Sequence, residues 1–472
     1  MRHSAWLLLL VLSACNENLA HTQPPMDRFF FPAGVALTQV AGGNAVAGAD
    51  QAMLVVSANF DLHYDKQEGA TLLSVDPGLY DEAAASGGSL GRPQGGLSKL
   101  GPGAQLGSYA GPVAVVDEAT CPGISGGPQA LVASRYTRKL YRFLIGSGGE
   151  VAPCRLDKLC QFDLDPDLLD PAPIGIACRA DGLRRSAFVS YLTSPSIGAV
   201  GGGTAWLSEF DLDDIGAKPR TFALGSGPVA EMAYDALTDR LYAVGRFAGL
   251  TAPLFILNLP SCSLSDPSCP LPQVQAVDLY SSLKGADLVS IALSNPQPGR
   301  PRLAYVAARV YDESYAAATR SRPPVDVGGA LMVVELQENV AGDPLARVRK
   351  VIPIGLGAGA VRVLGLRPGL GDLVVVPSSG DGTLYLYDDE LGVVRRIITI
   401  DEATGAPEAG HTPFSMVVED RGTEALVYVA AFSDWTIGVL RVPMANPSEA
   451  DLLRHTSGSL VGKPLRIGSP RP

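Results

Sequence analysis

The stretch Leu426-Val427-Tyr428-Val429-Ala430-Ala431-Phe432-Ser433-Asp434-Trp435-Thr436-Ile437 decides the fold. Its first half is an apolar run, its middle contains Ser and Asp, and a second apolar run begins at Thr436. β-Branched and aromatic residues favour strands, and Ser and Asp between two such runs are typical of a turn. The stretch is therefore predicted to form two antiparallel strands.

A unit of this kind recurs along the chain at irregular spacings of roughly 50–80 residues, as in repeat architectures. Each unit starts near a proline or glycine, continues into a strand that ends in a small residue, and adds further apolar runs after turns. About seven unit starts are recognisable, at residues 31–35, 111–114, 172–175, 227–230, 286–289, 359–362 and 412–415. Four strands in each of about seven units predict an all-β fold, a seven-bladed β-propeller of four-stranded antiparallel blades.

The quoted stretch resembles the Tyr-Val-Thr-Asn-type (YVTN) repeat of the surface-layer-like β-propeller family of extracytoplasmic proteins. The features in common are the small residues that end the first strand, the Ser-Asp turn and the Thr-apolar-x-apolar strand that follows. The resemblance extends over residues 29–470 and is clearest in the last unit. Because that family includes binding and surface proteins and a lactonase-like branch, the resemblance implies the fold more than the function.

The N-terminus has the pattern of a bacterial lipoprotein signal. Arg2 precedes a short apolar run, and small residues stand directly before Cys15. The run is much shorter than the ~20 apolar residues that span a bilayer, so the pattern predicts cleavage before Cys15 and its acylation, with palmitate among the acyl chains. An ordinary secretory signal with a chance cysteine is the alternative. The predicted organisation is a signal peptide at 1–14, a lipidated tether at 15–28 and a propeller domain at 29–472.

Asn16 follows Cys15. An aspartate at this position typically retains lipoproteins on the inner membrane, so the predicted localisation is the outer membrane, with its periplasmic and outer sides both open. The chain of 472 residues has a formal net charge of −11. An acidic balance argues against nucleic acid as a partner, because phosphate binding needs a basic face.

Six cysteines follow Cys15, an even number that is typical of a compartment where disulfides persist. The short separation between Cys262 and Cys269 predicts that these two pair with each other. The remaining four allow Cys154 with Cys160 and Cys121 with Cys178, and other pairings stay open. No pair has the close CxxC spacing of a metal site.

A propeller has two faces. We call the upper face the one with the connections between second and third strands and between successive blades; the lower face has the first-to-second and third-to-fourth connections. Long connections at 192–203, 310–328 and 83–110 are predicted on the upper face, where ligands typically bind. Ring closure is predicted to use an outer strand for the last blade from residues 465–468, with 28–31 as the alternative.

Equivalent positions at the upper ends of the second strands hold Asn59, Arg135, Leu192, Arg246, Arg309, Ser379 and Phe432. Among them, Asn59, Arg135, Arg246 and Arg309 are the candidate ligand-binding residues. Three arginines in matching positions of an acidic protein are suited to a small anion, since guanidinium groups bind carboxylate or phosphate. The alternative is that each arginine pairs with an aspartate of a neighbouring blade.

Slightly further along three of these connections stand Asp61, Asp381 and Asp434. Three carboxylates on one face make a weak candidate for a cation site, with calcium as the metal. Turn chemistry is the competing explanation, because Asp381-Gly382 is a typical turn pair.

No residue is assigned a catalytic role, because no Gly-x-Ser-x-Gly elbow stands in a strand-turn-helix context and no two histidines form an HxxxH pattern. The sequence therefore predicts an outer-membrane-anchored lipoprotein that acts as a propeller binding or interaction scaffold. Its partner is an unknown envelope protein or a small anionic ligand. A propeller enzyme of the lactonase-like or cofactor-dependent dehydrogenase kind is the alternative.

Overall fold

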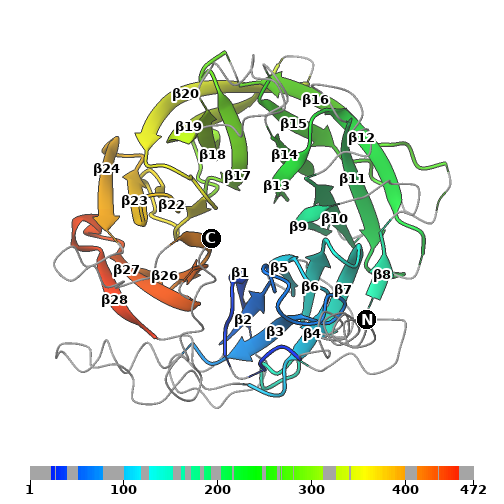
Figure 1. Cartoon of the computed structure of the whole chain (residues 1–472). Coiled ribbons are helices and arrows are strands. Elements are labelled where there is room, and N and C mark those ends of the chain that lie inside the picture. Colours follow the sequence, from blue (N-terminus) through cyan, green and yellow to red (C-terminus); the bar gives the residue numbers. More distant parts are fainter. Residues whose placement is uncertain are drawn as a thin grey trace, which may run out of the picture.

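Seven four-stranded antiparallel sheets surround a central axis as the blades of a propeller (Figure 1). The predicted fold class is thus confirmed by this computed structural model. No helix among the described residues is long and apolar enough to cross a membrane. The structure describes residues 23–26, 28–39, 51–77, 100–117, 127–151, 161–164, 172–180, 185–192, 204–214, 217–246, 251–262, 266, 268–279, 281–311, 326–339, 342–398, 412–433 and 435–456.

Each blade consists of four strands that are consecutive in the chain, and the first strand lies innermost. Blades 1 to 3 comprise β1 (Pro32–Gln39), β2 (Gln51–Ser57), β3 (Ala70–Val75), β4 (Ala104–Leu106); β5 (Ala110–Val116), β6 (Gln129–Ser134), β7 (Lys139–Leu144), β8 (Gln161–Asp163); and β9 (Pro173–Ala180), β10 (Arg185–Tyr191), β11 (Thr204–Asp211), β12 (Arg220–Ser226).

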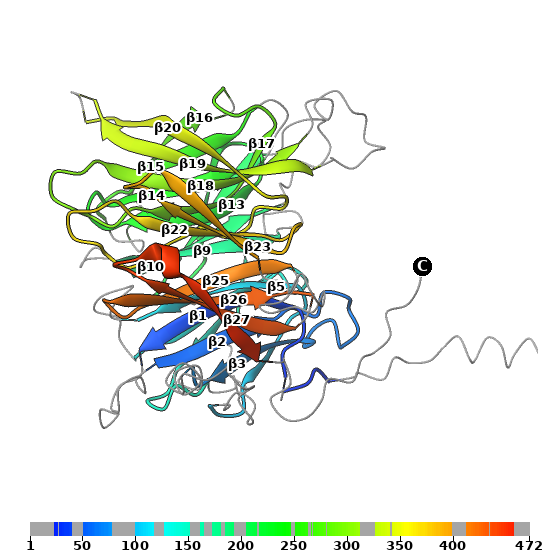
Figure 2. The ribbon, with the colours of Figure 1, turned by 90° about the vertical axis from the view of Figure 1, so that its left-hand side faces the viewer.

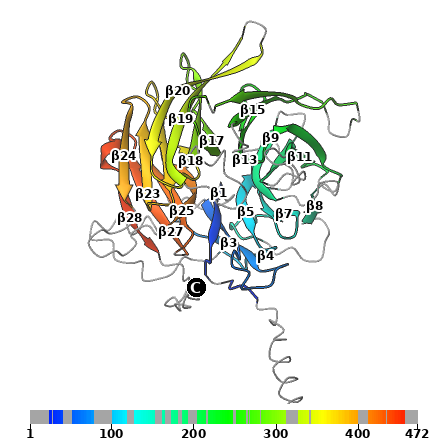
Figure 3. The same ribbon diagram turned by 45° about the horizontal axis from the view of Figure 1, so that its top comes forward.

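Blades 4 to 7 follow in the same order around the ring (Figure 3). They comprise β13 (Val229–Asp235), β14 (Arg240–Gly245), β15 (Pro253–Asn258), β16 (Gln273–Asp278); β17 (Ala286–Leu293), β18 (Arg302–Tyr311), β19 (Asp326–Glu338), β20 (Pro344–Ile354); β21 (Arg362–Val363), β22 (Leu373–Ser378), β23 (Thr383–Asp388), β24 (Val393–Ile398); and β25 (Pro413–Asp420), β26 (Glu424–Ala431), β27 (Thr436–Pro443), β28 (Asp451–Thr456). A short 3-10 helix, η3 (Pro447–Glu449), precedes β28.

The hydrophobic core is divided among the blade interfaces. Each of seven clusters of buried side chains joins two adjacent blades. One of them joins blade 7 to blade 1, which lie side by side in Figure 2. Middle strands have both faces buried in this arrangement, as in β26, where all residues after Glu424 are buried. This explains why the second strands are near-continuous apolar runs without polar alternation.

The inner strands are irregular at their upper ends. In six of the seven blades the pairing between the first and second strands shifts register near the start of the first strand. Such bulges bend a strand and re-aim its side chains. At two of these bulges the backbones of neighbouring inner strands lie close together, and a Cβ at Gly34 would lie 2.8 Å from the amide nitrogen of Val113 in the next blade.

Ring closure differs from both predictions. The outer strand of blade 7 is β28, which ends before residues 465–468, and these lie outside the described residues. Residues 28–31 form no strand of that blade. Instead Phe29 is buried in the apolar cluster between blades 7 and 1. The correct segment was hidden from sequence reasoning because Asp451–Thr456 has only a short apolar centre.

The long connections are partly where the sequence predicts them. Strand order makes the connections from β10 to β11 and from β18 to β19 second-to-third connections, as predicted, although residues 193–203 and 312–325 themselves lie outside the described residues. Residues 83–99 lie outside the described residues, but strand order places the stretch between β3 and β4 and so makes it no second-to-third connection, and the prediction for 83–110 is wrong in this respect. Its third-to-fourth connection belongs to the lower face.

Among the cysteines, the predicted pair Cys262–Cys269 is confirmed, with 5.7 Å between its Cα atoms, in the connection from β15 to β16. Cys178, in β9, is also disulfide-bonded. Cys121, Cys154 and Cys160 lie outside the described residues, so the pairing among the other four stays a prediction.

Candidate functional site

Two of the candidate arginines converge on one hydroxyl at the upper face. Arg246 follows β14, and Arg309 lies near the upper end of β18. Burial and the charge of Asp287 raise the pKa of Tyr311, whereas Arg246 and Arg309 both lower it. The geometry agrees, because Arg246 and the Tyr311 hydroxyl bind the same oxygen of Asp287, and Arg309 is the cross-strand neighbour of Asp287.

Arg246 has an acidic partner from the next blade. Its Nε and Nη2 donate to the two carboxylate oxygens of Asp287 at 2.6 and 2.5 Å. The Tyr311 hydroxyl donates to the same carboxylate at 3.2 Å. A bidentate pair of this kind matches the alternative in which an arginine is neutralised by a neighbouring aspartate.

Arg309 makes a weaker link to the next blade. Its Nε donates to the carbonyl oxygen of Ala358, in blade 6, at 3.2 Å. A carbonyl carries only a partial charge, so the guanidinium of Arg309 keeps most of its capacity to attract an anion.

Arg135 has a different environment. Its Nε is buried and has no hydrogen-bond acceptor, and among the described residues no carboxylate pairs with the guanidinium. Burial lowers the pKa of Arg135, the charge of Arg246 lowers it further, and Tyr109 opposes both effects. Arg135 is thus a desolvated cation without an anionic partner in the described part of the chain.

Asn59 is fully buried, and its amide holds the connection after β2. Its Nδ2 donates to Ser108 Oγ at 2.7 Å and to the Tyr64 carbonyl at 3.3 Å, while its Oδ1 accepts from the Tyr64 amide at 3.1 Å. The backbone of Asn59 has a positive φ of 47°, which asparagine adopts more readily than most residues. This geometry favours a structural role.

The three candidate aspartates do not form a described cation site. Asp61 accepts a hydrogen bond from the amide of His63 at 3.1 Å, as expected for a turn. Asp381 accepts from the Tyr385 hydroxyl at 3.2 Å. Asp434 lies outside the described residues. Within the described ranges no group of three or more His, Cys, Asp or Glu side chains is placed to hold a metal ion.

Closer to the axis, an ion pair links inner strands of three blades. Glu231, in β13, pairs with Nη1 of Arg362, in β21, at 3.0 Å. Ser290, in β17, donates its hydroxyl proton to Glu231 and accepts from the amide of Val361 at 2.8 Å. Sequence reasoning missed this group, although a charged residue in each of two inner strands was a visible signal.

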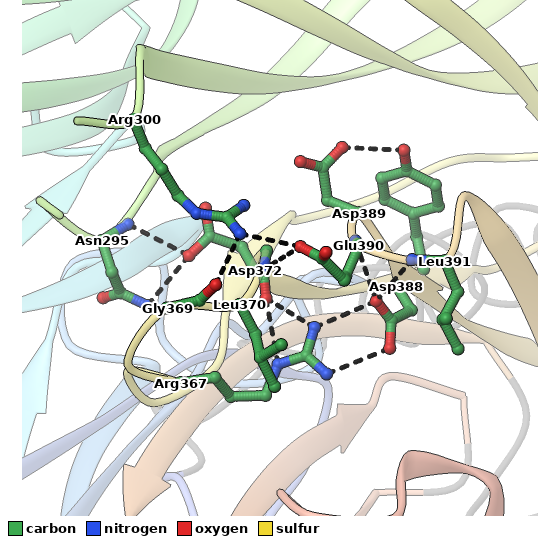
Figure 4. Close-up of polar contacts among 12 residues, drawn as sticks. Asn295, Arg300, Arg367, Gly369, Leu370, Asp372, Asp388, Asp389, Glu390 and Leu391 are labelled. Carbon is green, nitrogen blue, oxygen red and sulfur yellow. Dashed lines mark hydrogen bonds and ion pairs between the residues drawn. The ribbon is translucent and has the colours of Figure 1, made fainter. Parts of the chain in front are cut away.

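The lower face contains a polar cleft between blades 5 and 6. It is lined by Asn295, Arg300, Arg349, Asp372 and Asp389 among others. Figure 4 shows how side chains from the two blades link across it. Asp372 is buried and accepts from the Tyr305 hydroxyl at 3.0 Å and from the Asn295 amide group at 3.2 Å. Burial raises the pKa of Asp372, and these hydrogen bonds only partly offset that effect.

We expect Asp372→Asn to be more stable than the wild-type protein at neutral pH, by on the order of 1 kcal/mol, because it removes a buried charge. The raised pKa means that the folded state binds this proton more tightly than the unfolded state. Wild-type stability therefore falls as pH rises from about 4 through the folded pKa. Urea unfolding at several pH values should show a weaker dependence of the free energy of unfolding on pH in the variant than in the wild type. A variant that is equally destabilised at pH 4 and pH 7 would contradict the explanation.

No protein-family model matches this chain, and no curated protein matches it. Solved structures of low similarity include AztD from Citrobacter koseri in its apo form, with 9% identity, a TM-score of 0.41, and 91% of this chain and 94% of that chain covered. The dihydro-heme d1 dehydrogenase NirN in complex with DHE has 12% identity, a TM-score of 0.41 and coverages of 89% and 67%. A putative 6-phosphogluconolactonase from Bacteroides fragilis has 11% identity, a TM-score of 0.31 and coverages of 72% and 93%. Likenesses this distant carry no argument about function.

Proposed function

We propose that this protein is a lipid-anchored scaffold of the cell envelope that binds small anions at the upper face of its propeller. The observation that carries the proposal is Arg135, a half-buried guanidinium that no described carboxylate neutralises. Keeping such a group desolvated and close to a second cation costs folding free energy. A bound carboxylate or phosphate would offset that cost through charge-assisted hydrogen bonds.

The surrounding charges support the same ligand class. Arg246 and Arg309 stand near the same end of the axis, and of these two only Arg246 has a carboxylate partner among the described residues. In a chain with a net charge of −11, a local group of arginines is a selective feature. It would attract an anion that the rest of the surface repels.

Membrane attachment through Cys15 completes the proposal. The residues from 15 to 28 would tether the propeller to the outer membrane, with the YVTN-type propellers as the proposed family. We expect Cys15→Ser to move the protein from the membrane fraction to the soluble fraction, because acyl chains provide the anchor. Fractionation after high-salt and carbonate washes measures this. Unchanged membrane retention of the variant would contradict lipid anchoring.

The second candidate is the propeller enzyme, of the lactonase-like or dehydrogenase kind, and the observation that favours it is the lower cleft. There Asp372, with its raised pKa, lies beside Arg349 and Asp389. A carboxylic acid that keeps its proton can serve as a general acid. Hydrolysis of simple lactones by the wild-type protein, lost in Asp372→Asn, would support this candidate.

The anion-binding proposal is tested by Arg135→Gln in the full chain, with isothermal titration calorimetry of acetate, benzoate and inorganic phosphate. We expect at least a tenfold loss of affinity, because a hydrogen bond to a charged group contributes about 1.5–3 kcal/mol. We also expect unchanged or slightly higher stability, since a desolvated charge is removed.

Arg185→Gln is the matched control. Arg185 pairs with Asp213 at 2.7 Å, with both side chains partly exposed, at the lower end of β10. Its replacement removes the same charge far from the proposed site. Equal losses of affinity in both variants would indicate a nonspecific charge effect and would contradict a site at Arg135.

A further inference from the structure

Six aromatic rings gather on the upper face where blades 7, 1 and 2 meet. Phe31 lies at the centre, with ring centroids 5.2 Å from Phe432, 5.4 Å from Trp435 and 6.5 Å from Phe60. Phe60 also contacts Tyr109 at 5.6 Å and Phe432 at 5.4 Å. Phe414 contacts Phe432 at 5.8 Å and completes the set, which we call the aromatic platform.

The platform is open to solvent. Phe60 is 53% exposed, and the other five rings are half-buried. These residues come from the ends of β26 and β2 and from the starts of β1, β5 and β25, so all belong to the upper face. Exposed aromatic side chains that cluster in this way typically mark a binding site.

The backbone is strained where it presents these rings. Phe31, Tyr109 and Trp435 have φ values of 45°, 54° and 60°. The left-handed region costs a residue with a Cβ roughly 1–2 kcal/mol. Strain of this kind tends to persist at ligand-binding positions, where it fixes the direction of a side chain. Three of the six platform residues share it.

The platform is continuous with Arg135. The Tyr109 carbonyl accepts a hydrogen bond from the amide of Arg135 at 3.3 Å, which fixes the spacing between the two residues. Tyr109 is also near enough to influence the guanidinium electrostatically. An unneutralised cation therefore borders one side of an apolar surface, at its Tyr109 edge.

We propose that the upper face binds an aromatic carboxylate, with the ring on the aromatic platform and the carboxylate on Arg135. This inference rests on the proposed function and adds the apolar half of the ligand. The rings of Phe60 meet Tyr109 and Phe432 at interplanar angles of 83° and 85°. A planar aromatic ligand can extend this edge-to-face packing, because the positive edge of one ring is attracted to the negative face of another.

Sugars fit the platform less well, because they need hydrogen-bonding groups around the ring. Near the rings, the hydroxyls of Thr412 and Ser433 bond to each other at 2.7 Å. These hydroxyls are already engaged with each other, so the platform offers mainly apolar ring surface. It therefore favours ligands that are apolar except for their anionic group.

The test compares three probes by isothermal titration calorimetry on the full chain: 2-naphthoate, acetate and the neutral 2-naphthylmethanol, each with a detergent-only blank. We expect 2-naphthoate to bind at least tenfold more tightly than either other probe. Phe60→Ala should lower the affinity for 2-naphthoate about tenfold, because the exposed ring contributes apolar and edge-to-face contact. It should leave the affinity for acetate unchanged. Phe60→Leu keeps part of the apolar area, so its affinity for 2-naphthoate should lie between those of the wild type and Phe60→Ala. Arg135→Gln should lower the affinity for both 2-naphthoate and acetate.

Leu237→Ala is the control for the loss of an exposed apolar side chain, since Leu237 is 69% exposed in a turn of the lower face. It should change none of the affinities. If Phe60→Ala leaves the ratio of 2-naphthoate to acetate affinity unchanged while Arg135→Gln weakens both, the inference fails and the anion site stands. If Arg135→Gln leaves acetate binding unchanged, the proposed function fails. Equal affinity for 2-naphthylmethanol and 2-naphthoate would overturn the carboxylate as part of the ligand.

Discussion

Arg367→Ala is expected to lower the free energy of unfolding by about 3–5 kcal/mol, the typical cost of breaking a buried ion pair. Arg367, before β22, donates from Nη1 and Nη2 to the two carboxylate oxygens of Asp388 at 3.0 Å each, and both side chains are 7% exposed (Figure 4). Its Nε also donates to the Gly371 carbonyl at 3.0 Å. The variant leaves a buried carboxylate without its cation. Equilibrium urea unfolding measures the loss.

The effect should depend on pH. Burial alone would raise the pKa of Asp388, but hydrogen bonds from Arg367 and from the backbone amides of Leu391 and Glu390 bring it below its usual value. A lowered folded pKa contributes stability that is present above the unfolded pKa of about 4 and lost as pH falls through the folded value. The difference between wild type and variant should therefore shrink at acidic pH. A difference that stays constant from pH 7 to pH 3 would contradict the ion-pair explanation.

Arg300→Ala is the matched control in the same group of loops. Arg300 pairs with Glu390 at 2.8 Å, but the side chains are 35% and 39% exposed. Exposed pairs contribute about 0–1 kcal/mol. Similar losses in Arg300→Ala and Arg367→Ala would show that burial is not what determines the effect.

Gly34→Ala is expected to destabilise the protein by about 3 kcal/mol, because one methyl group has no space there. Its Cβ would lie 2.8 Å from the Val113 amide nitrogen and 2.9 Å from the Pro112 Cα. Both are backbone atoms of the next inner strand, so relief requires separating blades 1 and 2 at the axis. Thermal unfolding and urea titration would measure the loss.

Gly111→Ala tests whether steric contact is the cause. Gly111 occupies the inner strand of blade 2, but its Cβ would meet nothing closer than 3.6 Å. This substitution should be neutral or stabilising by about 0.4–1 kcal/mol, since alanine restricts the unfolded chain. Equal destabilisation at both positions would contradict the explanation from backbone approach.

Much of the fold could be predicted from sequence because each blade repeats the same local pattern. Unit starts such as Pro32 and Pro413 mark the inner strands, and apolar runs mark the buried second strands. The order of faces follows from strand order alone. The outer strands were harder to predict. The strand β4 has only three residues, so the connection 83–110 was assigned to the wrong face. The strand β28 has little apolar pattern, so the segment that completes blade 7 was predicted wrongly.

The candidate site was predictable only as a set of positions. Arg135 and Arg246 both follow the second strand of their blade, yet only Arg246 has an acidic partner among the described residues. That difference depends on Asp287, which belongs to another blade and is distant in sequence. The aromatic platform likewise combines rings from separate loops whose meeting is decided by the closure of the ring.

The ring closes without sharing a strand between its ends. Every blade is continuous in the chain, and within the described residues the sheets of blades 7 and 1 share no strand but are joined by packed side chains such as Phe29. The arrangement of the seven blades therefore does not depend on which blade comes first in the chain. Circularly permuted chains, with Arg28 linked to the end of β28 and new termini opened between any two blades, should assemble the same seven sheets. Duplication or loss of a whole blade would likewise alter the size of the ring and leave each remaining sheet intact.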